Sequence, residues 1–187
     1  MAAISPKTRH GRSGGQRRGA LLALLLWAGS AAEARAELLR LEVEFAAESL
    51  VGLGAGSVPQ GPVNGSFVLI VPAPQRVHGL LIEERVAIAL MHLKIGETYF
   101  LPRQTRAVLT ALDGTPIRLV IGGLPDGPYA LDPRHNDFKL VFTRVPDLES
   151  GDVLVFEEFS VTLADQGGTG FTAIAGSGTA KAQPLRN

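Results

Sequence analysis

The chain has 187 residues, of which 45% are hydrophobic, with 18 basic and 18 acidic side chains and no cysteine. The lack of cysteine excludes a disulfide framework, a thiolate metal site and a cysteine nucleophile. Residues 1–36 hold six of the basic residues and one acidic residue, so the rest of the chain has a formal net charge of about −5 and is a poor candidate for binding nucleic acid.

Residues 1–36 have the order of a secretory signal peptide. A basic region without acids precedes the apolar run Ala20–Ala28, which is too short to span a bilayer. Small residues then lead to Ala34-Arg35-Ala36, a cleavage site that makes Glu37 the first residue of the mature chain. We expect export to the periplasm or the outside of the cell, with general secretion favoured over the twin-arginine route that Arg17-Arg18 suggests. No membrane span is expected in the mature chain.

The first half of the mature chain has strand patterns. Leu39 to Phe45 alternate between apolar and polar residues, which predicts a strand with one solvent-exposed face. Ala46 to Pro62 is rich in glycine and proline and predicts a loop, and Val63 to Val71 predicts a strand that is apolar on both faces. The stretch from Leu80 to Phe100 fits a helix or a buried strand, because periodicity does not separate the two. We favour a strand, since the neighbouring segments are strands.

Arg106 to Ile121 carries the strongest local signal in the chain. Asp113-Gly114 lies between two β-rich runs, and this dipeptide favours a hairpin because both turn residues need a positive φ. Pro116 has no N–H for a ladder and is expected beside the turn or at an edge. The hairpin predicts an antiparallel β protein.

The second half of the mature chain continues as strands separated by turns. Gly122 to Asp137 predicts a long loop, and a strand follows it from Phe138. Val153 to Leu163 predicts a long strand with a bulge or bend at Glu157-Glu158. A turn at Asp165–Gly168 leads to a last strand, after which the tail is expected to fray from about residue 176.

These patterns predict one all-β domain over residues 37–187. About nine or ten short strands with frequent glycine and proline turns are typical of an antiparallel two-sheet β-sandwich, jelly-roll-like in form. A two-sheet sandwich of this kind buries one face of each strand, which matches the alternation of apolar and polar residues in most of the segments.

Three segments carry a resemblance to a known group. They are Gly61-Pro-Val-Asn-Gly-Ser-Phe67, the run from Val86 to Phe100 with its Leu-Lys-Ile-Gly-Glu-Thr-Tyr-Phe end, and a late Phe-x-Val-x-Leu strand. Their turn and aromatic pattern resembles uncharacterised exported bacterial β-sandwich proteins of the PEP-CTERM type. The resemblance implies a secreted β-sandwich with no established activity. Many members carry a C-terminal exosortase sorting tail, which this chain lacks, so anchoring by that route is not expected.

Residues 132–137, with the sequence Asp-Pro-Arg-His-Asn-Asp, form the densest polar cluster of the chain. His135 between Asp132 and Asp137 has the residue types of a metal site or an acid–base pair, but the same residues are typical of a solvated turn. The acid pairs Glu83-Glu84 and Glu157-Glu158 are neighbours in predicted strands, so the two members of each pair point to opposite faces. No catalytic residue, metal site or cofactor is therefore assigned.

The favoured function is that of a secreted, non-catalytic structural or interaction protein. A weak carbohydrate-binding module is the alternative, and a hydrolase that uses the Asp132–Asp137 loop is a less favoured one. The only tryptophan, Trp27, belongs to the expected signal peptide, which leaves Tyr99 and Tyr129 as stacking residues for a sugar. Any partner is expected to be a cell-surface protein or a glycan. The predicted binding residues are Tyr129, Asp132, Arg134, His135 and Asp137.

Overall fold

The computed structural model describes most of the chain after the expected signal peptide. The chain divides into two compact units, residues 1–35 and residues 36–187, and the first of these lies outside the described residues. No helix in the described part is long and apolar enough to cross a membrane. The described residues are 38–54, 56–73, 78–123, 131, 134–143 and 153–185.

The described part of the second unit consists of antiparallel strands and two short 3-10 turns. The turns are η1 (Pro102–Gln104) and η2 (Ala164–Gln166). The strands are β1 (Leu38–Gly52), β2 (Val63–Pro72), β3 (Leu81–Ile95), β4 (Thr98–Tyr99), β5 (Ala107–Leu112), β6 (Thr115–Gly122), β7 (Asp137–Thr143), β8 (Val153–Leu163) and β9 (Thr169–Pro184).

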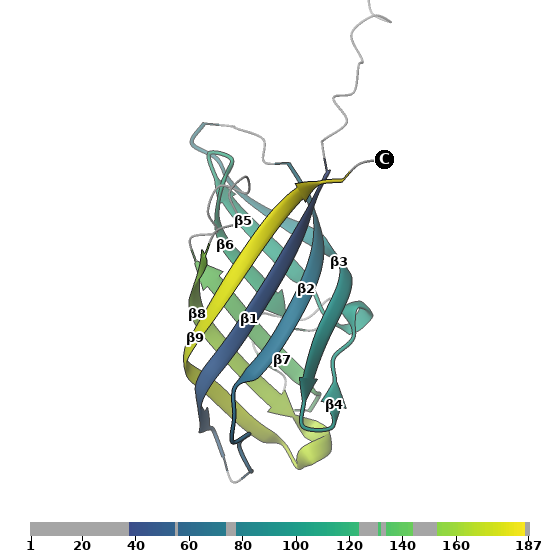
Figure 1. The fold of residues 1–187 in the computed structure, drawn as a ribbon, viewed down its shortest axis with the longest axis vertical. Coiled ribbons are helices and arrows are strands. Elements are labelled where there is room, and N and C mark those ends of the chain that lie inside the picture. The colour runs from purple at the N-terminus through teal and green to yellow at the C-terminus, as the bar shows by residue number, and fades with distance from the viewer. Residues whose placement is uncertain are drawn as a thin grey trace, which may run out of the picture. The chain divides into compact units, whose positions relative to one another are not determined.

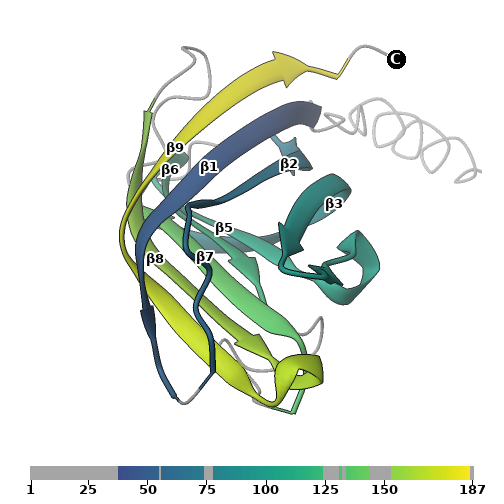
Figure 2. The same ribbon diagram turned by 60° about the horizontal axis from the view of Figure 1, so that its bottom comes forward.

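The sheet closes into an eight-stranded antiparallel barrel, to which the short strand β4 is added beside β3 (Figures 1 and 2). The first strand pairs with the last, from Leu39 opposite Pro184 to Gly52 opposite Phe171. The two-sheet β-sandwich predicted from the sequence is therefore wrong. Alternating burial is the same in a sandwich and in a barrel, and it does not reveal that the two ends of the chain pair with each other.

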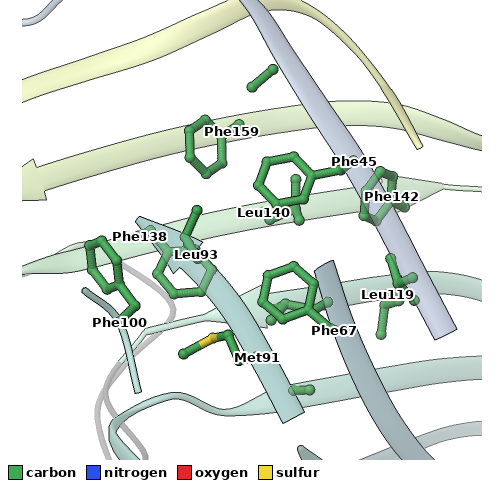
Figure 3. Close-up of a cluster of buried hydrophobic side chains, with 14 of the residues drawn as sticks. Phe45, Phe67, Met91, Leu93, Phe100, Leu119, Phe138, Leu140, Phe142 and Phe159 are labelled. Carbon is green, nitrogen blue, oxygen red and sulfur yellow. The ribbon is translucent and has the colours of Figure 1, made fainter. Parts of the chain in front are cut away.

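Phenylalanine rings fill the barrel interior (Figure 3). Phe67 stacks on Phe45 with ring centroids 5.8 Å apart, and Phe45 contacts Phe159 at 5.3 Å. Glycines on neighbouring strands make room for these rings, because a Cβ on Gly65 would lie 2.3 Å from the ring of Phe45. The interior is thus a packed core of large side chains opposite small ones.

The hairpin prediction is confirmed. Asp113 and Gly114 have φ angles of 52° and 77° and join β5 to β6. Pro116 lies beside this turn, opposite Ala111, as expected for a residue without an N–H. The preference for a strand at Leu81–Ile95 is also confirmed.

Two predicted boundaries are wrong, and one irregularity is confirmed. The loop expected from Ala46 begins only after Gly52, because β1 continues through Ser49, whose φ of 53° bends the strand. The tail expected to fray from about residue 176 is instead part of β9, where β1 supplies its hydrogen-bonding partners. The predicted bulge in β8 is present at Glu157, between the residues that pair with Val141 and Phe142.

Candidate functional site

A pocket of about 340 Å³ is lined by residues of β4, η1 and the start of β7. Figure 1 shows β4 at one end of the barrel. This volume falls in the range of sites that bind small molecules. The pocket is lined by Tyr99, Phe100, Arg103, Gln104, Thr105, His135, Asn136, Asp137 and Phe138.

The turn η1 fixes the position of Arg103 and Gln104 at the pocket. Pro102 begins this turn, and its carbonyl oxygen accepts a hydrogen bond from the Thr105 amide at 3.2 Å. The Thr105 hydroxyl donates to the carbonyl oxygen of Leu101 at 3.1 Å, which closes the segment on itself. The two polar side chains therefore extend from a short, internally bonded turn.

Phe100 and Phe138 connect the pocket to the barrel core. Their rings meet edge to face with centroids 5.0 Å apart, and Phe138 also stacks on Phe67 at 6.2 Å. The Phe100 amide donates to the carbonyl oxygen of Leu93 at 3.1 Å. The apolar side of the pocket is thus continuous with the core and is held rigidly.

Asp137 is a structural residue at the base of the pocket. Only 4% of its surface is exposed, and its Oδ1 atom accepts hydrogen bonds from the amides of Phe138 at 2.8 Å and Gly123 at 3.1 Å. Because backbone amides hold this carboxylate, it fixes the end of β6 to the start of β7. Asp137 also lines the pocket, so its predicted binding role stays a prediction beside this structural one.

The η2 turn supports the pocket from the β8–β9 connection. The Asn136 side-chain oxygen accepts a hydrogen bond from the Asp165 amide at 3.1 Å. The Thr98 hydroxyl donates to Asp165 Oδ2 at 2.9 Å and accepts a hydrogen bond from Gln166 Nε2 at 3.2 Å. These bonds join β4, η2 and the segment before β7, which are far apart in the sequence.

Tyr99 is the most accessible aromatic residue of the pocket, with 66% of its surface exposed. The Lys94 ammonium lies 4.9 Å from the centre of its ring, and Glu97 lies 3.7 Å from the same ammonium. A hydrogen bond with Tyr99, and then the negative charge of Glu97, raise the pKa of Lys94 above its usual value. Tyr99 thus offers an exposed ring beside a fixed positive charge.

The structure brings two of the five predicted binding residues, His135 and Asp137, into this pocket. Arg134 is exposed and does not line it, and Tyr129 and Asp132 lie outside the described residues. Sequence reasoning missed Arg103 and Gln104. Their only local signal is a polar pair directly after the Leu101-Pro102 strand end.

The acid pairs do not gather at His135. Glu83 and Glu84 pair with β5 near the Asp113 turn, whereas Glu158 lies opposite Val141 and is bonded to Lys139 at 2.6 Å. No three histidine, aspartate or glutamate side chains in the described ranges lie close enough to hold a metal ion.

Comparison with protein-family models, curated proteins and solved structures found no match for this chain. The function is therefore inferred from the chemistry of the pocket. An exposed tyrosine ring, a guanidinium group and two side-chain amides converge on a space of small-molecule size. This combination suits the binding of a polar ligand with an apolar face.

Proposed function

We propose that this protein is an exported, non-catalytic binding protein that holds a saccharide in the pocket at the end of the barrel. The observation that supports this proposal is the exposed ring of Tyr99 beside Arg103, Gln104 and Asn136. A sugar ring presents an apolar face to an aromatic side chain and hydroxyl groups at its rim, which match amide and guanidinium groups.

The proposal favours binding over catalysis because the described pocket residues place hydrogen-bonding side chains around an exposed aromatic ring. Oδ1 of Asp137 accepts hydrogen bonds from two backbone amides, and Asn136 accepts a hydrogen bond from the η2 backbone. A rigid scaffold with polar groups on its loops is the common arrangement of binding sites. The favoured ligand class also agrees with a location outside the cytoplasm, where glycans are exposed.

Replacing Tyr99 by alanine, or Arg103 by alanine, is expected to weaken saccharide binding about three- to tenfold, because each change removes a stacking or hydrogen-bonding contact. A glycan array on the mature protein identifies the saccharide, and isothermal titration calorimetry then measures the affinities.

The matched control for Arg103 is Arg118→Ala, which removes an exposed arginine that lies 3.8 Å from Glu157 on the barrel wall. Its affinity should equal that of the unmodified protein. Binding that is unaffected by both pocket substitutions would refute the site, and the absence of any bound saccharide on the array would refute the proposed function.

Export is proposed from the order of basic, apolar and small residues in residues 1–36. When the full-length chain is expressed, the intact mass of the protein recovered outside the cytoplasm is expected to match a chain that begins at Glu37. Ala36→Pro should block this cleavage, because the site needs a small, flexible residue. Recovery of the chain with Met1 in the cytoplasm would contradict export.

A further inference from the structure

A second hollow, of about 570 Å³, is shallow and wide open to solvent, and it lies on the outer wall of the barrel over β9, β1, β2 and β3. Figure 1 shows these four strands side by side on the face toward the viewer. We call this hollow the wall groove. Its polar lining consists of Glu44, Asn64, Ser66, His92, Ser177 and Thr179.

Strand register places four of these side chains in one row. Thr179 lies opposite Glu44, Glu44 lies opposite Ser66, and Ser66 lies opposite His92. Because neighbouring strands are about 4.8 Å apart, the row crosses the wall over roughly 14 Å. Ala46 lies between Ser177 and Asn64 in the next outward row, and these small side chains keep the groove open.

The six polar side chains of the wall groove are not used by the fold. Within the described ranges, no hydrogen bond or ion pair to another side chain or to the backbone engages them. The polar cluster on β7, β8 and β9 differs, because Lys139 and Ser160 both bond to Glu158, and Thr172 bonds to Ser160. The wall groove is therefore a row of available donors and acceptors.

The wall groove leads toward the barrel-end pocket along β3. His92 is two residues, or about 7 Å of strand, from Lys94, and both side chains are exposed. Lys94 pairs with Tyr99 of β4 and lies over its ring, and Tyr99 lines the pocket. One polar track thus connects Thr179 to the pocket across five strands.

The side chains that line the wall groove indicate which class of ligand it can bind. The wall groove has no lysine or arginine in its lining, and Glu44 repels anions, which disfavours nucleic acids and acidic polymers. Its one apolar ring, Phe45, is buried, which disfavours a lipid. Serine, threonine and asparagine side chains can each donate and accept, as sugar hydroxyl groups do, whereas a peptide N–H only donates and its C=O only accepts.

We propose that the wall groove and the barrel-end pocket form one continuous site for a linear, neutral polysaccharide. The pocket binds one end of the bound segment at Tyr99, and the groove binds the following sugar units through Glu44, Ser66 and His92. This proposal rests on the proposed function, since it extends saccharide binding from a single unit in the pocket to a chain.

The test compares a disaccharide with its polymer, using cellobiose with hydroxyethyl cellulose, maltose with soluble starch, and mannobiose with galactomannan. Calorimetry on the mature protein should show at least one polymer bound about tenfold more tightly than its disaccharide, because the groove adds contacts that the disaccharide does not reach. The double variant Glu44→Ala, His92→Ala should lose this advantage and keep the disaccharide affinity. Tyr99→Ala should weaken both ligands.

The matched control is Glu42→Ala, a change on the same face of β1 but outside the groove lining, and it should keep the polymer advantage. Urea unfolding midpoints confirm that all variants are folded. Disaccharide binding without a polymer advantage, or an advantage that survives the double variant, would overturn the continuous site and leave the pocket intact. No binding of any of these ligands would overturn the continuous site, and an empty glycan array would overturn the proposed function with it.

Discussion

Replacing Gly122 by alanine is expected to destabilise the barrel by about 3–5 kcal/mol, the combined cost of backbone strain and overpacking. Gly122 ends β6 with a φ of 120°, a conformation that side chains disfavour. A Cβ at this position would lie 1.9 Å from the carbonyl oxygen of Phe138. That oxygen accepts a hydrogen bond from the Gly123 amide at 2.8 Å, so it cannot move away without losing a bond between the end of β6 and the start of β7.

Urea unfolding followed by circular dichroism measures this loss as a lower midpoint. The matched control is Gly167→Ala, because Gly167 has a φ of 74° but an added methyl group there would have no neighbouring atom within 4 Å. Gly167→Ala should therefore lower the free energy of unfolding by about 1–2 kcal/mol, the cost of placing a side chain in the left-handed backbone region. Equal midpoints for the two variants would show that the contact with Phe138 is not a constraint on the fold.

Replacing Phe67 by alanine is expected to cost about 3–5 kcal/mol, the usual cost of deleting a buried aromatic side chain. Phe67 is 1% exposed and contacts both Phe45 and Phe138, at centroid distances of 5.8 and 6.2 Å. Its loss would leave a cavity between the ring that lines the pocket and the rings of the barrel centre. A lower saccharide affinity of the pocket is therefore expected together with a lower urea midpoint of unfolding.

Phe67→Leu should cost less than about 1.5 kcal/mol, because it keeps most of the apolar volume. Tyr99→Ala should change the unfolding free energy by about 0.5 kcal/mol or less, since most of this ring is exposed. Tyr99→Ala is thus expected to weaken binding with little loss of stability, whereas Phe67→Ala is expected to lower both. If Phe67→Ala unfolds at the same urea concentration as the unmodified protein, the ring stack does not stabilise the barrel.

The candidate site could be predicted only in part. The polar segment 132–137 stands out in the sequence, and three of its residues, His135, Asn136 and Asp137, do line the pocket. The β4–η1 residues Arg103 and Gln104 carry no motif, and their place at the pocket depends on how β3 turns back at Gly96. Polar side chains that meet from two distant segments leave no pattern in either segment.

The wall groove was not predicted for the same reason. Glu44, Ser66 and His92 lie in three separate segments of the sequence, and only the register of β1, β2 and β3 places them in one row. A shift of one residue between two strands would turn one of these side chains into the core. Register is a property of the closed sheet.

The sequence by itself determined the antiparallel β class and the Asp113-Gly114 turn, and it indicated a bulge or bend at Glu157-Glu158. The stretch from Leu80 to Phe100 stayed open between a helix and a strand, and only the structure shows the strand Leu81–Ile95. These features depend on local chemistry: the φ preferences of glycine and aspartate, and apolar residues at a spacing of two. Only the tertiary structure decided between a sandwich and a barrel, because β9 is ordered by its pairing with β1 at the other end of the chain. Turn and strand preferences act over a few residues, whereas barrel closure depends on hydrogen bonds between segments that no local pattern connects.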